Sequence, residues 1–296
     1  MFSLYKLIEP LMRGKKKSNE TYVSPTGHVE ELDQTGRIAT QPVPYSVIRD
    51  ERRHLIYAKF ENSIAHSFWR AQELSLFSRH LMGRSGATMD FGCGDGSLTN
   101  CILDNVSAGV DIDETALSVA REYGIYESLY TFEEMKSDIP TGKYDTIFSV
   151  SVLEHTTDPK DCLDEIFRAL KSGGSFMFSV PNKNFTAHMA TLIDEEFANA
   201  MNERMYHRNL LSEAEWRTFL EEAGFKIDSF IEFQPLEMTK RYFSLSLLGR
   251  RGLGRIPGLR WTYETLFMRQ LLNAVDRSIS GDNDSGANYL ISCTKE

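Results

Sequence analysis

Cysteine is scarce in this 296-residue chain and follows no metal-binding or disulfide pattern. The four cysteines, Cys93, Cys101, Cys162 and Cys293, are scattered, and no two of them have C-x-x-C spacing. Such a distribution supports neither a zinc site nor a disulfide framework. We therefore predict no metal and expect a protein of the reducing cytosol, that is, a cytoplasmic one.

Long apolar runs and a surplus of positive charge are also lacking. No apolar run approaches the ~20 residues of a membrane span, and the N-terminus lacks the features of a secretory signal. The chain has 33 Lys and Arg against 42 Asp and Glu, which gives a formal net charge of −9. This acidic balance argues against general nucleic-acid binding. A hydrophobic content of 41% is ordinary for a soluble globular protein.

The most distinctive stretch of the sequence is a glycine-rich turn that lacks the spacing of dinucleotide-binding turns. Residues 87–99 read A-T-M-D-F-G-C-G-D-G-S-L-T, with Gly92, Gly94 and Gly96 at alternate positions. This is not the G-x-G-x-x-G of dinucleotide-binding turns, which disfavours a nicotinamide-dependent oxidoreductase. Glycine suits the turn because its dihedral angles would oppose a Cβ, and because a ligand can approach bare backbone closely. The pattern predicts a strand, a glycine turn and a helix start around a ligand, although a ligand-free turn has the same composition.

Alternating strand and helix patterns continue after this turn. Residues 108–113 predict a second strand, and Asp111 lies about twenty residues beyond the first, where a carboxylate can accept both ribose hydroxyls of a nucleoside. Asp113 suits the N-cap of the next helix. Further strands are expected at 128–131, 144–151, 175–180, 227–233 and 288–294, the last two as an antiparallel hairpin. Helices are expected at 185–205, after the Ser212 capping box, and from Asp158-Pro159 to Gly173-Gly174. The alternation predicts a doubly wound parallel sheet.

These motifs together resemble the S-adenosylmethionine-dependent methyltransferases of the Rossmann-like type, in the branch of ubiquinone and small-molecule O-methyltransferases. The resemblance rests on D-F-G-C-G-D-G at 90–96 and on the run 144–182, which contains L-E-H, L-K-x-G-G and P-N; it covers roughly residues 85–182. It implies an α/β fold with a doubly wound, mostly parallel seven-stranded sheet, an N-terminal helical lid and a helical insertion before the last strand. It also implies S-adenosyl-L-methionine as the cofactor.

The resemblance assigns cofactor contacts to a defined set of residues. They are Asp90, Gly92, Cys93, Gly94, Gly96, Asp111, Ile112, Ser151 and Val152. At the adenine end, the family often has an acidic residue before a Leu/Ile-Pro pair. Here the matching position is about Met135, with Glu134 and Asp138 out of register, so the adenine contact is left open.

His155 is the candidate catalytic residue, because it follows the fourth predicted strand. Neutral imidazole suits proton removal from a hydroxyl near pH 7. A histidine that merely orients the following loop is an equal alternative. Tyr206, His207 and Arg208 are the next candidates, on a segment expected to border the acceptor site.

The chain divides into an N-terminal segment, 1–48, and a methyltransferase domain, 49–296, with a cofactor-binding core at 85–182 and a basic helical insertion at 236–286. Residues 1–17 fit a short packed helix or a segment lying on an anionic membrane surface. Residues 49–82 predict the lid helix. Between Glu237 and Glu264 the insertion has no acid but six basic residues: Lys240, Arg241, Arg250, Arg251, Arg255 and Arg260. This reversal of charge predicts an anionic partner or, equally, a solvated loop.

We therefore expect a methyltransferase for a small-molecule, glycan or lipid-linked acceptor, with oxygen slightly favoured over other acceptor atoms. An anionic acceptor and peripheral membrane contact are consistent with the basic insertion. A non-catalytic binding protein of the same fold is the first alternative, and a nicotinamide-dependent oxidoreductase is the second.

Overall fold

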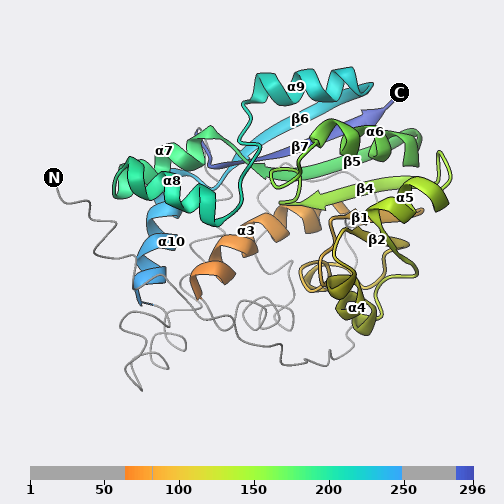
Figure 1. Ribbon diagram of the computed structural model, residues 1–296, viewed down its shortest axis with the longest axis horizontal. Helices are drawn as coiled ribbons and strands as arrows, with labels where there is room; N and C mark the ends of the chain where they lie inside the picture. Colours follow the sequence, from red (N-terminus) through yellow and green to blue (C-terminus); the bar gives the residue numbers. More distant parts are fainter. Residues whose placement is uncertain (1–63, 82, 249–284) are drawn as a thin grey trace. The chain divides into compact units, whose positions relative to one another are not determined.

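The computed structural model describes residues 64–81, 83–248 and 285–296 (Figure 1). The chain separates into two compact units, one of residues 1–84 and 240–281, the other of residues 85–239 and 282–296. The predictions for the N-terminal segment, for the first part of the lid and for most of the basic insertion lie outside the described residues. So do Arg250, Arg251, Arg255 and Arg260.

Seven strands in the described part of the chain form one sheet, in the order β3-β2-β1-β4-β5-β7-β6 (Figure 1). Their bounds are β1 Thr88–Phe91, β2 Ala108–Asp111, β3 Leu129–Thr131, β4 Tyr144–Val150, β5 Leu170–Pro181, β6 Phe225–Phe233 and β7 Asn288–Lys295. Strands β1 to β5 pair in parallel, whereas β7 runs antiparallel to both β5 and β6. The predicted doubly wound, mostly parallel seven-stranded sheet is confirmed.

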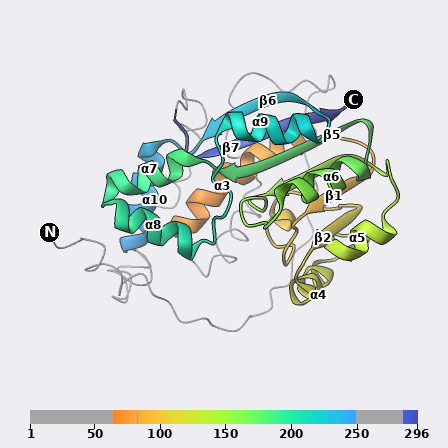
Figure 2. The ribbon, with the colours of Figure 1, turned by 45° about the horizontal axis from the view of Figure 1, so that its top comes forward.

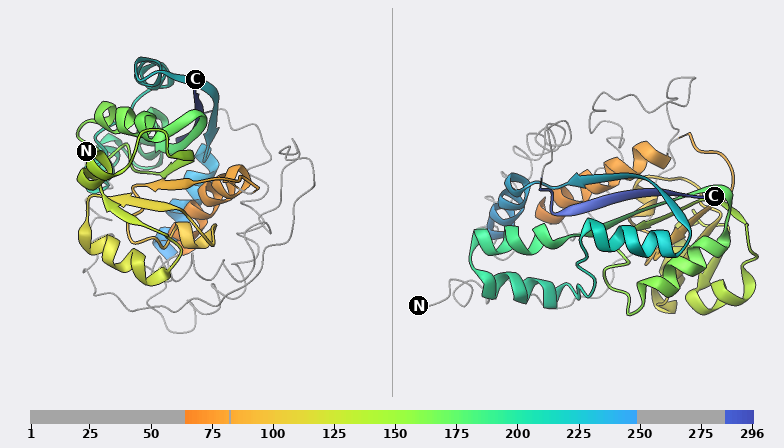
Figure 3. Two further views of the ribbon diagram at one scale, coloured as in Figure 1. Left: turned by 90° about the vertical axis from the view of Figure 1, so that its right-hand side faces the viewer. Right: turned by 90° about the horizontal axis from the view of Figure 1, so that it is seen from above.

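Helices from the second unit cover this sheet. Their bounds are α4 Glu114–Tyr123, α5 Phe132–Asp138, α6 Pro159–Ala169, α7 Lys183–Leu192, α8 Glu195–Arg204 and α9 Glu213–Glu222. Helices α6 and α9 lie along the same face (Figure 3), and α7 packs against α8 (Figure 2). Trp216 of α9 is fully buried against Phe178 of β5, with ring centroids 5.2 Å apart. The central strands read as apolar runs because both of their faces are covered.

The predicted helix starts at Asp113, Asp158 and Ser212 are confirmed. The Asp113 side chain accepts from two backbone N–H groups at the start of α4, and Asp158 does the same for α6, where Pro159 is the first helical residue. Ser212 forms a capping box with Glu215. Each cap satisfies N–H groups that have no partner within their helix.

Two helix predictions differ from the structure around the cofactor-binding core. The glycine turn leads not into an α-helix but into a short 3-10 turn, η2 Thr99–Cys101. The chain leaves this turn early because Val106 already bridges Tyr126 beside β2. Helix α6 ends at Ala169 rather than at the two glycines that follow, because Leu170 pairs with Tyr144 and begins β5.

Two further differences concern local caps. The helix predicted over 185–205 is split into α7 and α8, because Asp194 is extended and its side chain caps α8 at the Phe197 N–H. Helix α5 was not predicted. It is short, and it begins with a capping box between Thr131 and Glu134 that follows β3 directly.

The first unit is described through α3 Ile64–Leu81 and α10 Leu236–Leu248, which begins in the second unit. Within this unit the Tyr242 hydroxyl of α10 lies 3.2 Å from Nε2 of His66, and its ring lies 5.2 Å from that of Trp69. In the described residues, helix is present at 64–81 of the predicted lid and at 236–248 of the predicted insertion, and the lid function stays a prediction. Of the basic residues of the insertion, Lys240 and Arg241 are described, and both are exposed. The anionic partner also stays a prediction.

No helix in the described ranges has the length and apolar character needed to cross a membrane.

Candidate functional site

The glycine turn follows β1 at the point where the strand order reverses. Strand β1 pairs with β2 on one side and with β4 on the other, and all three run parallel. Ligands of doubly wound sheets bind beyond the carboxyl ends of the strands at such a point. The residues that follow β1, β2 and β4 are therefore the candidate ligand contacts.

The three glycines of the turn have left-handed dihedral angles but different surroundings. Gly92, Gly94 and Gly96 have φ values of +77°, +54° and +74°. A Cβ on Gly92 would collide with the Val152 side chain, and one on Gly96 would lie 2.9 Å from the Tyr126 ring. A Cβ on Gly94 would have no atom within 4 Å. Packing thus requires glycine at two positions, whereas Gly94 leaves open space at the surface of the turn.

Asp111 stands at the tip of β2 and faces this turn. One carboxylate oxygen accepts from the Gly94 N–H at 2.7 Å, and the other accepts from the Asp113 N–H at 3.0 Å. Each oxygen keeps a second lone pair, so the fixed carboxylate can still accept from two hydroxyls. The next residue, Ile112, is 84% exposed. A carboxylate beside an exposed apolar side chain fits a nucleoside, with its ribose on Asp111 and its base against Ile112.

The structure shows what the Asp90 side chain contacts. Its side chain is buried beneath the turn, where one carboxylate oxygen accepts from the Thr99 hydroxyl at 2.5 Å and from the Tyr126 hydroxyl at 2.7 Å. A carboxylate in this position supports the turn from below, and its predicted contact with the cofactor stays a prediction. The Cys93 thiol is buried too, next to Gly109. Because the Cys93 side chain is buried, only the backbone of Cys93 could contact the cofactor.

Burial of Asp90 should make the stability of the fold depend on pH. Burial raises the pKa of Asp90 from 3.8 to about 6. Between these values the folded chain binds more protons than the unfolded chain, so the contribution of this group to stability falls as pH rises. Asparagine does not titrate, so Asp90→Asn lacks this loss of stability. We therefore expect the free energy of unfolding of Asp90→Asn, minus that of the original protein, to be roughly 1–2 kcal/mol higher at pH 7.5 than at pH 5. Denaturant unfolding of both proteins at the two pH values measures this, and a constant difference would contradict it.

The loop after β4 completes the candidate site. Ser151 has a φ of +53°, and its N–H donates to the carbonyl and the hydroxyl of Ser179, both at 3.1 Å. Val152 lies next to Gly92, as described above. A non-glycine residue in the left-handed region is typical of functional sites. The predicted residues Gly92, Gly94, Asp111 and Val152 are thus brought together, with Ser151 next to them in the chain.

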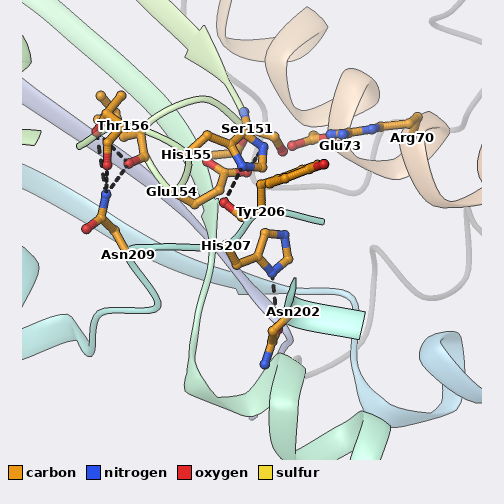
Figure 4. Close-up of polar contacts among 12 residues, drawn as sticks. Arg70, Glu73, Ser151, Glu154, His155, Thr156, Asn202, Tyr206, His207 and Asn209 are labelled. Atoms are coloured by element: carbon orange, nitrogen blue, oxygen red, sulfur yellow. Dashed lines mark hydrogen bonds and ion pairs between the residues drawn. The ribbon is translucent and has the colours of Figure 1, made fainter. Parts of the chain in front are cut away.

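His155 lies at the end of this loop, where its imidazole is exposed (Figure 4). Its Nδ1 lies 3.2 Å from the Tyr206 carbonyl oxygen, which can only accept, so this nitrogen carries the proton in the neutral ring. Nε2 is then the unprotonated ring nitrogen, and it lies 3.6 Å from a carboxylate oxygen of the buried Glu154. A protonated His155 would form an ion pair with this carboxylate.

A second segment holds the His155 loop in place. The Glu154 carbonyl oxygen accepts from the backbone N–H groups of Arg208 and Asn209, at 2.7 and 3.0 Å. The Asn209 side-chain amide donates to the carbonyl oxygens of Leu153 and Thr156, at 2.9 and 2.8 Å (Figure 4). Sequence reasoning missed Asn209, for which no pattern gives a signal. The L-E-H motif offered a signal for Glu154.

The adenine-end candidates are occupied elsewhere. A carboxylate oxygen of Glu134 accepts from the Thr131 N–H at 2.7 Å within the cap of α5, and Met135 is fully buried. Asp138 accepts from the neighbouring Ser137 hydroxyl at 2.7 Å. Ile112 is therefore the residue that best fits the base of a nucleoside.

Comparisons with known proteins identify the family of this chain. A model of the methyltransferase domain family matches residues 37–229. This chain belongs to that family. Ubiquinone biosynthesis O-methyltransferase of Pseudomonas aeruginosa strain UCBPP-PA14 is 30% identical over 213 residues, which cover 64% of this chain and 90% of that protein. The enzyme of the same name from Nitrosococcus oceani is 27% identical over 207 residues, covering 62% and 87%.

Solved methyltransferase structures share the fold. A SAM-dependent methyltransferase from Thermotoga maritima superimposes with a TM-score of 0.52 at 17% identity, covering 83% of this chain and 100% of that one. Geranyl diphosphate methyltransferase in complex with SAM gives a TM-score of 0.52 at 16% identity, covering 86% and 96%. The protein is an S-adenosylmethionine-dependent methyltransferase, and S-adenosyl-L-methionine is its cofactor.

The residues of this methyltransferase fit that cofactor. The open surface at Gly94, the fixed carboxylate of Asp111 and the exposed Ile112 provide a close backbone approach, a ribose acceptor and an apolar face. No group of three or more His, Cys, Asp or Glu side chains in the described part of the chain is placed to hold a metal ion.

Alanine at two neighbouring glycines should separate folding from cofactor binding. Gly92→Ala forces Cβ against Val152 in a left-handed backbone, and we expect it to lower the free energy of unfolding by roughly 2–4 kcal/mol. Gly94→Ala carries only the dihedral penalty, roughly 1–2 kcal/mol, but places a methyl group where the cofactor approaches.

We expect Gly94→Ala to lower the affinity for S-adenosylhomocysteine more than about tenfold. Denaturant unfolding and calorimetric titration measure the two effects, and equal unfolding losses would contradict the assignment.

Proposed function

We propose that this enzyme transfers the methyl group of S-adenosyl-L-methionine to a phenolic hydroxyl of a small molecule, with His155 as the general base. The observation that carries the proposal is the exposed imidazole at the end of the β4 loop, whose Nδ1 lies 3.2 Å from the Tyr206 carbonyl oxygen, so that Nε2 is the basic nitrogen of the neutral ring. The relatives named ubiquinone biosynthesis O-methyltransferase support oxygen as the acceptor atom.

The chemistry is an in-line displacement. The bound cofactor supplies a methyl group on a positively charged sulfur. The acceptor oxygen forms a bond to the methyl carbon while the carbon–sulfur bond breaks, and the hydroxyl proton passes to Nε2 of His155. The residues of the glycine turn and of the β4 loop orient the reactants, and orientation of this kind corresponds to effective molarities of ~10⁵–10⁸ M.

The base limits the class of hydroxyl. A neutral imidazole has an ordinary pKa of about 6.5, and a phenol such as the tyrosine side chain has one of about 10. An aliphatic alcohol is closer to water, at about 15.7. Proton transfer to imidazole is therefore far less unfavourable from a phenol than from an aliphatic alcohol. Phenols are the acceptors that this site suits best.

The proposal is tested with cofactor labelled with ¹³C in its methyl group. We expect catechol to give a methoxy signal by NMR with one equivalent of S-adenosylhomocysteine formed. Benzyl alcohol, which has a ring but an aliphatic hydroxyl, should react at less than about one hundredth of that rate. Equal rates for catechol and benzyl alcohol would contradict the proposal. Methylation of aniline, which offers nitrogen as the acceptor atom, without methylation of catechol would contradict it too.

A further inference from the structure

An exposed tyrosine stands beside the candidate base. Tyr206 is 74% exposed, although most large apolar side chains in the described part of the chain are buried. Its carbonyl oxygen is the acceptor for Nδ1 of His155. The ring of the following residue, His207, lies 5.7 Å from the His155 ring at an interplanar angle of 29°. The His155 and His207 rings thus contact each other at the end of the β4 loop, and Tyr206 is drawn beside them in Figure 4.

The backbone around Tyr206 is fixed on both sides. The Tyr206 N–H donates to the Glu203 carbonyl at 3.1 Å, and the His207 N–H donates to the Asn202 carbonyl at 3.0 Å. The His207 ring is held by the Asn202 side chain at 3.2 Å and by an edge-to-face contact with Phe185, with centroids 5.1 Å apart. Arg208 and Asn209 are anchored to the β4 loop as described above. The exposure of the Tyr206 ring is therefore built into an ordered segment.

Tyr206 also adopts a backbone conformation that suits a different residue. Its φ is +56°, in the left-handed region that is disfavoured by a Cβ and is typical of glycine or asparagine. Because the ring is largely in solvent, its packing contributes little free energy to offset this dihedral penalty. For a bulky residue such as tyrosine this conformation is an outlier, and strained residues of this kind cluster at functional sites.

We propose that Tyr206 is a specificity-determining residue, whose ring forms one wall of the acceptor site and stacks on the planar ring of the acceptor. The inference rests on the proposed function, because it places the acceptor next to His155. Aromatic rings stack with an offset at centroid distances of 4.5–7 Å, the range over which the neighbouring imidazoles already lie. Because the backbone is fixed, only the two side-chain torsions of Tyr206 have to be ordered when the acceptor binds, which limits the entropy lost on binding.

Three substitutions separate this function from a structural one. Tyr206→Phe keeps the ring, Tyr206→Ala removes the ring but keeps the dihedral penalty, and Tyr206→Gly removes both. If the ring does not support the fold, Tyr206→Ala should have the melting temperature of the original protein within about 2 °C, and Tyr206→Gly should melt about 2–4 °C above Tyr206→Ala. Ser285→Gly is the matched control, because Ser285 is exposed, has a φ of +68° and carries no ring.

The kinetic test uses catechol as the acceptor at saturating cofactor. We expect Tyr206→Ala and Tyr206→Gly to raise the KM for catechol about five- to tenfold, with kcat changed less than about threefold. Tyr206→Phe and Ser285→Gly should keep KM within about twofold, and S-adenosylhomocysteine affinity should be unchanged in all four variants.

Calorimetric titration of catechol into the protein saturated with S-adenosylhomocysteine gives the same comparison without turnover. It therefore tests the ring even if methyl transfer to catechol fails and the proposed function with it. An unchanged KM and catechol affinity in Tyr206→Ala, no catechol binding by the original protein, or a melting temperature of Tyr206→Ala lowered by more than about 5 °C would overturn the proposal.

Discussion

Replacement of His155 by alanine is expected to lower kcat for methylation of catechol by a factor of about 10²–10⁴, the usual contribution of a general base. The affinity for S-adenosylhomocysteine should stay within about twofold, because the exposed imidazole lies on the loop after β4 and not on the glycine turn. Without Nε2 the hydroxyl proton has no acceptor beside Glu154 and must pass to water. Steady-state kinetics of the purified variant, together with calorimetric titration, measure both quantities.

A second substitution distinguishes the base from a histidine that only orients the loop. In His155→Gln the side-chain amide can still donate to the Tyr206 carbonyl, but it has no basic nitrogen. We expect the glutamine variant to lose as much activity as the alanine variant, and added imidazole to restore part of the activity of His155→Ala. Activity of His155→Gln within about threefold of the original protein would assign His155 to loop orientation.

Replacement of Asp111 by alanine is expected to lower the affinity for S-adenosylhomocysteine roughly 30- to 150-fold, which corresponds to about 2–3 kcal/mol. Hydrogen bonds to a charged acceptor are of this strength, and the ribose of the cofactor offers two hydroxyls. The variant also removes the acceptor of the Gly94 N–H, 2.7 Å away, and so frees the part of the turn that faces the ligand. Both effects weaken binding, so they add in the same direction.

The cofactor side of the candidate site depends on residues that are close in the sequence, so the sequence could indicate which of them lie together. Alternate glycines after a buried strand, and an acid at the tip of the next strand, require only the parallel order of β1 and β2 to lie together. The caps at Asp113, Asp158 and Ser212 are equally local, and all three were predicted. Asp90 was given a ligand contact because a sequence pattern does not show which face of a strand end is covered. The hydroxyls of Thr99 and Tyr126 cover it.

The acceptor side depends on contacts between segments far apart in the chain. Asn209 reaches the loop after β4 from a segment that follows four further elements of structure, α6, β5, α7 and α8, and no periodicity signals such a contact. The backbone conformations of Ser151 and Tyr206 are imposed in the same way, since serine and tyrosine do not favour positive φ. The end of α6 was misplaced for a related reason, because the pairing of Leu170 with Tyr144 overrides the helix-stopping glycines.

The central claim is that the cofactor binds at the turn after β1 with its ribose on Asp111. Its most direct test is calorimetric titration of S-adenosylhomocysteine into the original protein, Asp111→Ala and Asp113→Ala. Asp113 lies two residues further on, carries the same charge and caps α4, so its loss should cost about 1 kcal/mol of stability but change the affinity less than about twofold. The account predicts that Asp111→Ala alone loses most of its affinity. Equal affinity in the original protein and in Asp111→Ala, or equal losses in both variants, would contradict it.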